Sequence, residues 1–328
     1  MKDKNVNLCD RIDEMRSFEK SATPPFPTKN LLLETTNFCN HKCIFCANSK
    51  MTRKRGFINE ELAYSVLEQA YSLGMREVGF YATGEPLMNK NLEKYVKKAK
   101  KTGYDYIYLT TNGALMTEER AVGLLEAGID SVKFSINAGT EESYEKIHGH
   151  NNFHQVIDNL RRLDALRKIN NPQMKLFVSY IINRINIDEQ QTLKQLVGNY
   201  VDDILFVNVA NQSGLMCEEV KRLTVEHDEH DFNITIPCFQ AFHTVNVSYE
   251  GYLTACCADF QNYLAVADLN EVSLKDAWDS EAFCKLRDKH LTDSLEGTLC
   301  YNCAYNCKQS IAPLVSKYAT IIEEGKNQ

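Results

Sequence analysis

The chain has 328 residues, of which 44% are hydrophobic, a size and composition that suit one large domain with a smaller appendage. The formal net charge of −7 argues against a basic nucleic-acid-binding face, so we expect no nucleic-acid partner. No apolar run reaches the ~18 residues that a membrane-spanning helix needs, so we also expect no membrane partner. The polar start at residues 1–5 lacks the apolar centre of a signal peptide, and the expected location is cytoplasmic.

Residues 1–29 are charged and then proline-rich, which predicts an extended and partly mobile N-terminal arm. From residue 30 to 208, short apolar runs alternate with amphipathic helices. The predicted strands cover residues 31–35, 77–81, 104–110, 131–136, 175–182 and 204–208. The predicted helices cover residues 59–73, 89–102, 117–127, 152–168 and 188–200. This alternation predicts an α/β fold with parallel crossovers, and six strands favour a partial, open (β/α)6 barrel. Its chemistry is expected on loops at the carboxyl ends of the strands.

Three further segments follow the predicted barrel. Residues 209–237 are polar and irregular, which predicts a connecting segment that lines the site. Residues 238–310 form a small cysteine-rich domain, in which a hairpin is predicted to turn at Glu250-Gly251. Short helices are predicted to follow around residues 273–278 and 280–290. Residues 311–328 form a C-terminal tail.

Twelve cysteines are unusual for a chain expected in a reducing compartment, where disulfides are rare. Metal or cluster ligation is the default interpretation. Cys39, Cys43 and Cys46 form the pattern CxxxCxxC and closely follow the first predicted strand. Three thiolates on one loop can each bind one iron of a cubane, which leaves the fourth iron open for a small ligand with an amine and a carboxylate. A zinc site with His41 as its fourth ligand is the alternative.

With this motif the chain resembles the radical S-adenosylmethionine (SAM) superfamily. The resemblance implies that SAM binds the open iron of a 4Fe–4S cluster, with Phe45 beside the adenine. Thr83-Gly84-Glu85-Pro86, after the second strand, is similar to the family's GGEP-like motif, although Thr83 replaces a glycine. Carbonyls of such a turn accept hydrogen bonds from the SAM ammonium, and Glu85 adds negative charge nearby. The resemblance implies further SAM contacts at strand ends from Asn112, Ser135, Asn137 and Ser179.

The later cysteines resemble the SPASM/twitch extension of radical SAM enzymes, with Cys-x12-Gly-x4-Cys followed by CxxC. The chain lacks the further cysteines of a full SPASM extension, so the resemblance implies one auxiliary 4Fe–4S cluster. The spacing is similar to that of the twitch dehydrogenase of butirosin biosynthesis, and the implied ligands are Cys238, Cys256, Cys300 and Cys303. Cys257 or Cys307 remains an alternative ligand, and a four-cysteine zinc site remains an alternative for the whole group.

The resemblance implies SAM and two 4Fe–4S clusters as cofactors, a flavodoxin or ferredoxin-type reductant as partner, and a small-molecule substrate. The leading expectation is a dehydrogenase-type radical SAM oxidoreductase that converts a secondary alcohol of a sugar, cyclitol or nucleotide sugar to a ketone. The auxiliary cluster then accepts the electron. The alternatives are a radical SAM epimerase of a sugar or peptide, in which the thiol of Cys217, Cys257 or Cys307 returns hydrogen, a peptide-modifying maturase, and a non-catalytic iron–sulfur electron carrier.

The catalytic base is left open by the sequence. Lys221 and Arg222 in the polar connecting segment are candidates, together with Cys217 as a reactive thiol and the nearby His227 and His230. The basic run Arg53-Lys54-Arg55, which follows the first cysteine loop, is expected either to meet an anionic substrate or to be surface charge.

Overall fold

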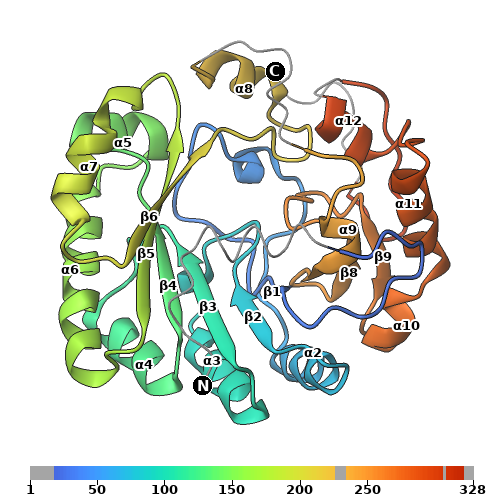
Figure 1. The fold of residues 1–328 in the computed structure, drawn as a ribbon, viewed down its shortest axis with the longest axis horizontal. Coiled ribbons are helices and arrows are strands. Elements are labelled where there is room, and N and C mark those ends of the chain that lie inside the picture. Colours follow the sequence, from blue (N-terminus) through green and yellow to red (C-terminus); the bar gives the residue numbers. More distant parts are fainter. Residues whose placement is uncertain (1–17, 226–233, 306–307, 321–328) are drawn as a thin grey trace.

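The computed structural model describes residues 18–225, 234–305 and 308–320. A parallel sheet occupies its N-terminal two thirds, with neighbours in the order β6-β5-β4-β3-β2-β1 (Figure 1). Its strands are β1 (Leu31–Leu33), β2 (Glu77–Phe80), β3 (Tyr106–Thr111), β4 (Ser131–Ser135), β5 (Lys175–Ile182) and β6 (Asp203–Asn208). Each strand pairs in parallel with its chain neighbour, which confirms the predicted open (β/α)6 barrel.

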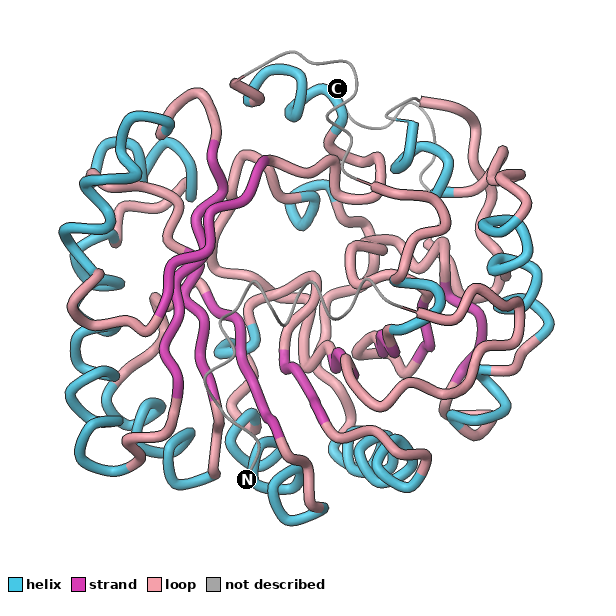
Figure 2. Tube along the Cα trace, viewed as in Figure 1, coloured by secondary structure: helices cyan, strands magenta, loops and turns pink. Residues whose placement is uncertain are grey.

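Helices cover the outer face of this sheet (Figures 1 and 2). All five predicted helices are present as α2 (Glu60–Ser72), α3 (Leu92–Thr102), α4 (Glu118–Ala127), α6 (Phe153–Asn170) and α7 (Gln190–Val197). The Asn59 side chain caps the start of α2, and Gly103 ends α3 with a positive φ of 113°. Such caps satisfy backbone groups that a helix end leaves without partners, which is why the predicted and observed ends agree closely.

The cysteine-rich segment continues the same sheet. β7 (Val245–Val247) pairs in parallel with β1, and β8 (Tyr252–Thr254) and β9 (Ala265–Asp268) follow as antiparallel strands. The predicted hairpin at Glu250-Gly251 therefore forms between β7 and β8, where Gly251 has a φ of 101°. Because one nine-stranded sheet joins the barrel to this segment, the two predicted domains share a sheet.

Several short elements were not predicted. α5 (Glu141–His148) precedes α6, and α8 (Cys217–Leu223) lies in the segment predicted to be irregular. The other elements that were not predicted are α9 (Gln240–His243), α12 (Leu299–Tyr305) and the 3-10 helices η1 (Ala47–Lys50), η2 (Pro86–Met88) and η3 (Ile187–Glu189). The two short helices predicted around residues 273–278 and 280–290 are present as α10 (Leu274–Trp278) and α11 (Glu281–Leu291).

The described part of the N-terminal arm packs against the C-terminal segment. Phe18 stacks on Phe242 with ring centroids 5.1 Å apart, and Phe26 meets the edge of Trp278 at 5.4 Å. The Trp278 indole also donates to the Pro24 carbonyl at 3.1 Å. The expected mobility of the arm is thus wrong for residues 18–29. Among the described helices, none is long and apolar enough to span a bilayer.

Candidate functional site

The first cysteine loop leaves the carboxyl end of β1 and runs into η1. Its backbone is held against the end of α5, since Lys42 N donates to His148 O and Ile44 N donates to Ile147 O, both at 3.0 Å. A further 3.0 Å bond from Cys46 N to Cys43 O closes the tight turn between two of the cysteines.

The three thiols of this loop influence one another. Burial raises the pKa of Cys43 well above its ordinary value, and the neighbouring Cys46 and Cys39 raise it further. Burial and the Glu85 carboxylate raise the pKa of Cys39 to about 12. Arg55 lies close enough to act in the opposite direction on Cys39 and Cys46. Three converging thiols beside a guanidinium fit an iron–sulfur group, whose binding displaces their protons.

Histidines surround the outer side of Cys43. His148 Nδ1 lies 3.5 Å from Cys43 Sγ, and the His148 ring stacks on Tyr144 at 4.1 Å. Ligand atoms of His41, Cys43 and His148 all lie within 4.8 Å of one another. This histidine-containing set and the three-cysteine set share Cys43, so only one of them can be filled at a time. The role of His148 was not predicted, because nothing in its local sequence points to the cysteine loop.

The turn at residues 83–86 packs directly on the cysteine loop. A Cβ on Gly84 would lie 2.6 Å from the Phe38 carbonyl oxygen, so a glycine is required there. The Glu85 carboxylate accepts from Thr111 Oγ1 and from Asn112 N, both at 2.7 Å. Glu85 thus braces the end of β3 with both of its oxygens, whereas the sequence suggested only a charge near SAM.

The other residues of this turn are also engaged. The Thr83 carbonyl accepts from Asn48 Nδ2 at 2.6 Å, and the Thr83 hydroxyl donates to Glu34. Pro86 is the first residue of η2, where its missing N–H costs no hydrogen bond. These contacts fix the turn in place beside the cysteine loop. The carbonyl oxygens of the turn keep lone pairs that can accept hydrogen bonds from a ligand.

The predicted strand-end contacts differ in their surroundings. Ser135 and Ser179 are half-buried neighbours on β4 and β5, with hydroxyl oxygens 3.4 Å apart. The Asn112 amide donates to Asn40 Oδ1 at 2.8 Å and so fastens β3 to the cysteine loop. Asn137 is buried, and its Oδ1 accepts from Ile181 N at 2.7 Å. The Asn137 side chain thus bridges the ends of β4 and β5 and His148, and its expected ribose contact stays a prediction.

Phe45 is also buried, as expected for an aromatic ring beside the third cysteine. It packs on Ile147 of α5 and Leu223 of α8, with Ile181 at the end of β5 nearby. These contacts place the ring on the side of the loop that faces β5 and α8.

The second cysteine group converges as its spacing predicts. One apolar cavity is lined by Cys238, Cys256, Cys300 and Cys303. Burial raises the pKa of Cys300 and Cys303 well above the ordinary value, and the nearby Cys256 raises each further. Four buried thiols around one apolar space fit a cluster or a metal ion. Cys307, the alternative ligand, lies outside the described residues.

Cys256 and Cys257 border different larger cavities, although both also line a small cavity beside Arg53 and their thiols are hydrogen-bonded to each other. Cys256 lines the four-cysteine cavity, whereas Cys257 lines a second cavity of about 280 Å³ inside the barrel. Lys133 of β4 and three tyrosines, Tyr81, Tyr106 and Tyr108, also line this barrel cavity. Lys133 was missed, although its position between buried Val132 and Phe134 in a strand already signalled an inward-facing lysine.

The predicted catalytic candidates of the connecting segment do not line the barrel cavity. Lys221 and Arg222 are exposed on α8, and Lys221 pairs with Glu218 at 3.8 Å. Cys217 is buried and donates to the Gly214 carbonyl at 3.2 Å, close to Cys303. None of the three lines the barrel cavity, so their expected role as base or thiol donor stays a prediction that this cavity does not support. His227 and His230 lie outside the described residues.

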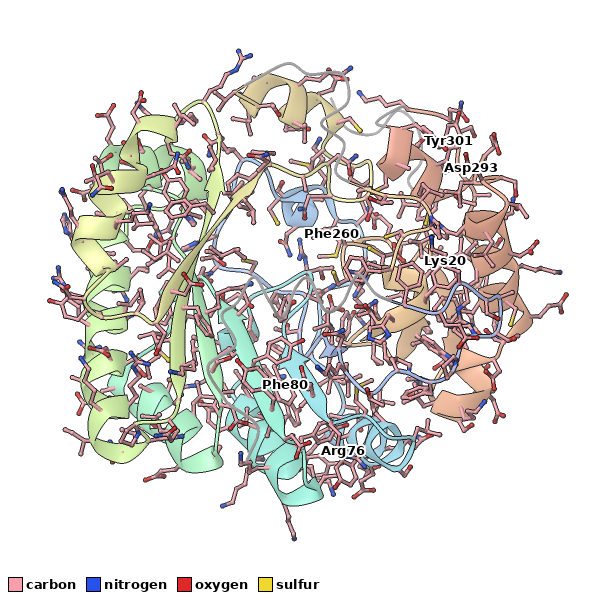
Figure 3. The ribbon with its side chains drawn as sticks, in the orientation of Figure 1. Lys20, Arg76, Phe80, Phe260, Asp293 and Tyr301 are labelled. Atoms are coloured by element: carbon pink, nitrogen blue, oxygen red, sulfur yellow. The ribbon has the colours of Figure 1, made fainter. Side chains whose placement is uncertain are left out.

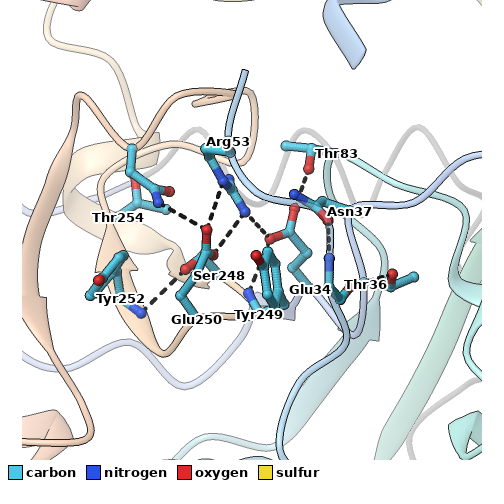
Figure 4. Close-up of polar contacts among 12 residues, drawn as sticks. Glu34, Thr36, Asn37, Arg53, Thr83, Ser248, Tyr249, Glu250, Tyr252 and Thr254 are labelled. Carbon is cyan, nitrogen blue, oxygen red and sulfur yellow. Dashed lines mark hydrogen bonds and ion pairs between the residues drawn. The ribbon is translucent and has the colours of Figure 1, made fainter. Parts of the chain in front are cut away.

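Arg53 joins the cysteine loop to the C-terminal hairpin (Figure 4). Its guanidinium bonds Glu34 of the β1 end at 2.6 Å and Glu250 of the hairpin at 2.9 Å. Glu34 also accepts from Tyr249 N at 3.0 Å. Since Arg53 is only 3% exposed, its charge is neutralised inside the protein, and the expected contact with an anionic substrate is wrong.

Phe260 makes a second connection between the two cysteine regions. Figure 3 shows it near the centre of the molecule, between the parallel strands and the C-terminal helices. Its ring is buried against Ala47 and Met51, which follow the first cysteine loop, and against Met216. The first cysteine loop and the chain just after Cys257 are therefore packed together.

Comparisons with known proteins agree with this arrangement. Residues 33–196 match the radical SAM superfamily, and residues 238–307 match the SPASM family, described as an iron–sulfur cluster-binding domain. The chain is 28% identical over 163 residues to a probable GTP 3′,8-cyclase of Saccharolobus islandicus, an alignment covering 50% of this chain and 51% of that protein. It is 30% identical over 166 residues to the PqqA peptide cyclase of Gluconobacter oxydans, covering 50% and 44%. The chain thus spans about half the length of these relatives.

Solved structures share the fold. BtrN in complex with AdoMet and 2-DOIA has a TM-score of 0.57 at 20% identity, covering 89% of this chain and 96% of BtrN. SuiB of Streptococcus suis bound to its precursor peptide SuiA has a TM-score of 0.63 at 14% identity, covering 84% and 68%. The three-cysteine loop, the open barrel and the family match agree, and the chain belongs to the radical SAM superfamily as an enzyme with a C-terminal SPASM-type iron–sulfur domain.

Proposed function

We propose that this protein is a radical SAM dehydrogenase that oxidises a secondary alcohol of a sugar, cyclitol or nucleotide sugar to a ketone. Its cofactors are SAM, one SAM-binding 4Fe–4S cluster and one auxiliary 4Fe–4S cluster. The observation that carries the proposal is the placement of two consecutive cysteines. Cys256 lines the four-cysteine cavity, while Cys257 lines the barrel cavity where a substrate would bind.

The ligand sets follow from the geometry. Cys39, Cys43 and Cys46 would hold the SAM-binding cluster, and the four cysteines around the apolar cavity would hold the auxiliary one. When bound, these cofactors supply a 5′-deoxyadenosyl radical that takes a hydrogen atom from carbon, and an acceptor for the electron left behind.

The protein's own residues then orient the reactants. The rigid turn at residues 83–86 and the hydroxyls of Ser135 and Ser179 face the SAM end of the barrel, with Phe45 at its side. The barrel cavity of about 280 Å³ suits a monosaccharide or cyclitol ring, or the sugar part of a larger ligand. The likeness to BtrN, solved with AdoMet and 2-DOIA, also supports a small ligand.

An epimerase is the second candidate, favoured by one specific observation. The Cys257 thiol lines the barrel cavity, where it could return a hydrogen atom to a substrate radical. A peptide-modifying role is suggested by SuiB and the PqqA peptide cyclase, although no residue described above favours it.

Two labelling experiments with reduced holoprotein and SAM separate these activities. With scyllo-inositol and 2-deoxy-scyllo-inosamine deuterated at their carbinol carbons, in ordinary water, we expect a ketone and the transfer of one deuterium to 5′-deoxyadenosine. With the unlabelled cyclitols in deuterium oxide, an inverted alcohol that carries one solvent deuterium, and that is not formed by Cys257→Ala, would establish the epimerase instead.

The reductant is part of the same proposal. We propose that a reduced flavodoxin or ferredoxin supplies the electron that starts each SAM cleavage. Exposed lysines on α3, among them Lys97 and Lys101, present positive charge that suits an acidic partner of this kind. Cross-linking of the holoprotein to flavodoxin, compared between wild type and a Lys97→Glu/Lys101→Glu variant, tests the docking face.

A further inference from the structure

A lysine lies on the inner face of the barrel sheet. In β4, buried Val132 and Phe134 alternate with Ser131, Lys133 and Ser135, so these last three share the opposite face. Both Ser131 and Lys133 line the barrel cavity. A lysine in the middle of a parallel strand is costly to bury, which calls for a reason in the chemistry of the cavity.

The described residues around Lys133 include no counter-ion for its ammonium. Its Nζ lies 5.9 Å from the ring centroid of Tyr81, and Tyr108 and Cys257 line the same space. Among the described residues, no carboxylate lies within ion-pair distance of this ammonium. The one acidic side chain lining the cavity, Glu77, pairs with Lys29 at 3.9 Å. Burial lowers the pKa of Lys133, a shift that the Cys257 thiol partly opposes.

The position of Lys133 relates it to both redox sites. Ser135, at the SAM end, lies two residues farther along the same face of β4, which corresponds to about 7 Å along a strand. Cys257, across the cavity, directly follows the cluster ligand candidate Cys256. The cavity extends from Lys133 towards Glu77, Tyr106 and Ser131, the first residues of β2, β3 and β4. A ring bound at its Lys133 end would therefore lie on the side of the cavity nearest to the SAM end and beside Cys257.

We propose that Lys133 is the catalytic base that removes the hydroxyl proton of the substrate alcohol. This inference rests on the proposed dehydrogenase function. SAM at the three-cysteine cluster would supply the 5′-deoxyadenosyl radical that takes the carbinol hydrogen atom, and a cluster held by Cys238, Cys256, Cys300 and Cys303 would supply the acceptor for the remaining electron. The neutral Lys133 amine takes the hydroxyl proton. The step would then balance as one ketone, one ammonium, one reduced cluster and one 5′-deoxyadenosine.

Two variants show whether Lys133 acts as a base or only binds the substrate through its positive charge. Lys133→Gln removes both functions, whereas Lys133→Arg keeps a positive charge whose pKa is too high for proton transfer. With the two deuterated cyclitols named above, the ratio of ketone to 5′-deoxyadenosine should fall about 100-fold or more in both variants. Iron content and SAM cleavage should remain, which shows that the variants fold. Lys285→Gln, at an exposed lysine on α11, is the matched control and should behave as wild type.

The outcomes distinguish this inference from the function on which it rests. If wild type forms no ketone from either cyclitol, the dehydrogenase proposal fails, and the role of Lys133 fails with it. If wild type forms ketone and Lys133→Arg keeps the wild-type ratio of ketone to 5′-deoxyadenosine, only the role of Lys133 is overturned. Competitive acetylation of the holoprotein over a pH series needs no substrate. Lys133 should become reactive at lower pH than Lys101, and a midpoint equal to or above that of Lys101 would also overturn the inference.

Discussion

At the scale of single residues, the hydrogen bond between His148 and Cys43 has a defined direction. The backbone N–H of Asn137 can only donate, and it lies 3.3 Å from His148 Nε2. In a neutral imidazole the proton therefore resides on Nδ1, which donates to Cys43 Sγ at 3.5 Å. Hydrogen bonds to cluster sulfurs make a cluster easier to reduce, so His148 is a positioning residue that acts through Cys43.

His148→Phe tests this bond while keeping the stack on Tyr144. We expect the midpoint potential of the three-cysteine cluster to become more negative, because the thiolate loses its hydrogen-bond donor. The measurement is a redox titration followed by electron paramagnetic resonance, in protein that also carries Cys300→Ala to remove the auxiliary signal. His154→Phe, at an exposed position on α6, serves as the control. An unchanged potential in His148→Phe would show that the bond has no electronic effect.

At the scale of secondary-structure elements, Arg53 holds the β1 end, the first cysteine loop and the β7–β8 hairpin together. Burial raises the pKa of Glu34, but Arg53 and the hydrogen bonds to Glu34 outweigh it, so the net shift is downward. A lowered folded-state pKa contributes stability above the unfolded pKa, and this contribution is lost as the pH falls through the folded value.

Arg53→Met leaves the Glu34 and Glu250 carboxylates without their cation. Because Glu34 is 2% exposed, we expect a loss of about 3–5 kcal/mol in the free energy of unfolding at neutral pH. Urea titration monitored by fluorescence measures this change. Lys94→Met, which removes an exposed pair with Glu60 at 3.3 Å, should cost at most about 1 kcal/mol. Equal losses of unfolding free energy in Arg53→Met and Lys94→Met would show that the buried Arg53 ion pairs contribute no more than an exposed pair.

At the scale of the whole molecule, one sheet carries both cysteine sites. β1 leads into the first cysteine loop, β7 pairs with β1 from Leu31 and Val245 onward, and β8 leads into Cys256. Backbone hydrogen bonds of the shared sheet therefore fix the four-cysteine site relative to the first cysteine loop. A fixed separation of this kind would suit electron transfer between the two cysteine sites.

Iron content tests this two-site organisation. Anaerobically reconstituted protein should hold about eight irons, from two four-iron clusters. Replacing Cys39, Cys43 and Cys46 together by Ala should leave about half of the iron and abolish SAM cleavage. Cys300→Ala should also lose iron but retain some SAM cleavage while blocking product formation. One tightly bound zinc with about four irons in wild type would instead indicate a structural zinc site at the four cysteines.

The sequence alone determined the barrel, the first cysteine loop and the auxiliary cysteine set. Apolar periodicity sets strands and helices locally, and three cysteines within eight residues cannot lie far apart whatever the fold. The short α5 and α12 escaped prediction because two turns carry too little periodic signal, and α5 brings His148 to the loop.

Only the tertiary structure decided which side chains share a space. Cys256 and Cys257 are adjacent in sequence and their thiols are hydrogen-bonded, yet only Cys256 lines the four-cysteine cavity and only Cys257 lines the barrel cavity. Lys221 and Arg222 looked reactive in a polar segment, but α8 exposes them, while β4 turns Lys133 inward. The physical reason is that spacing along the chain limits distance only over a few residues, whereas the direction of a side chain depends on which face its element buries.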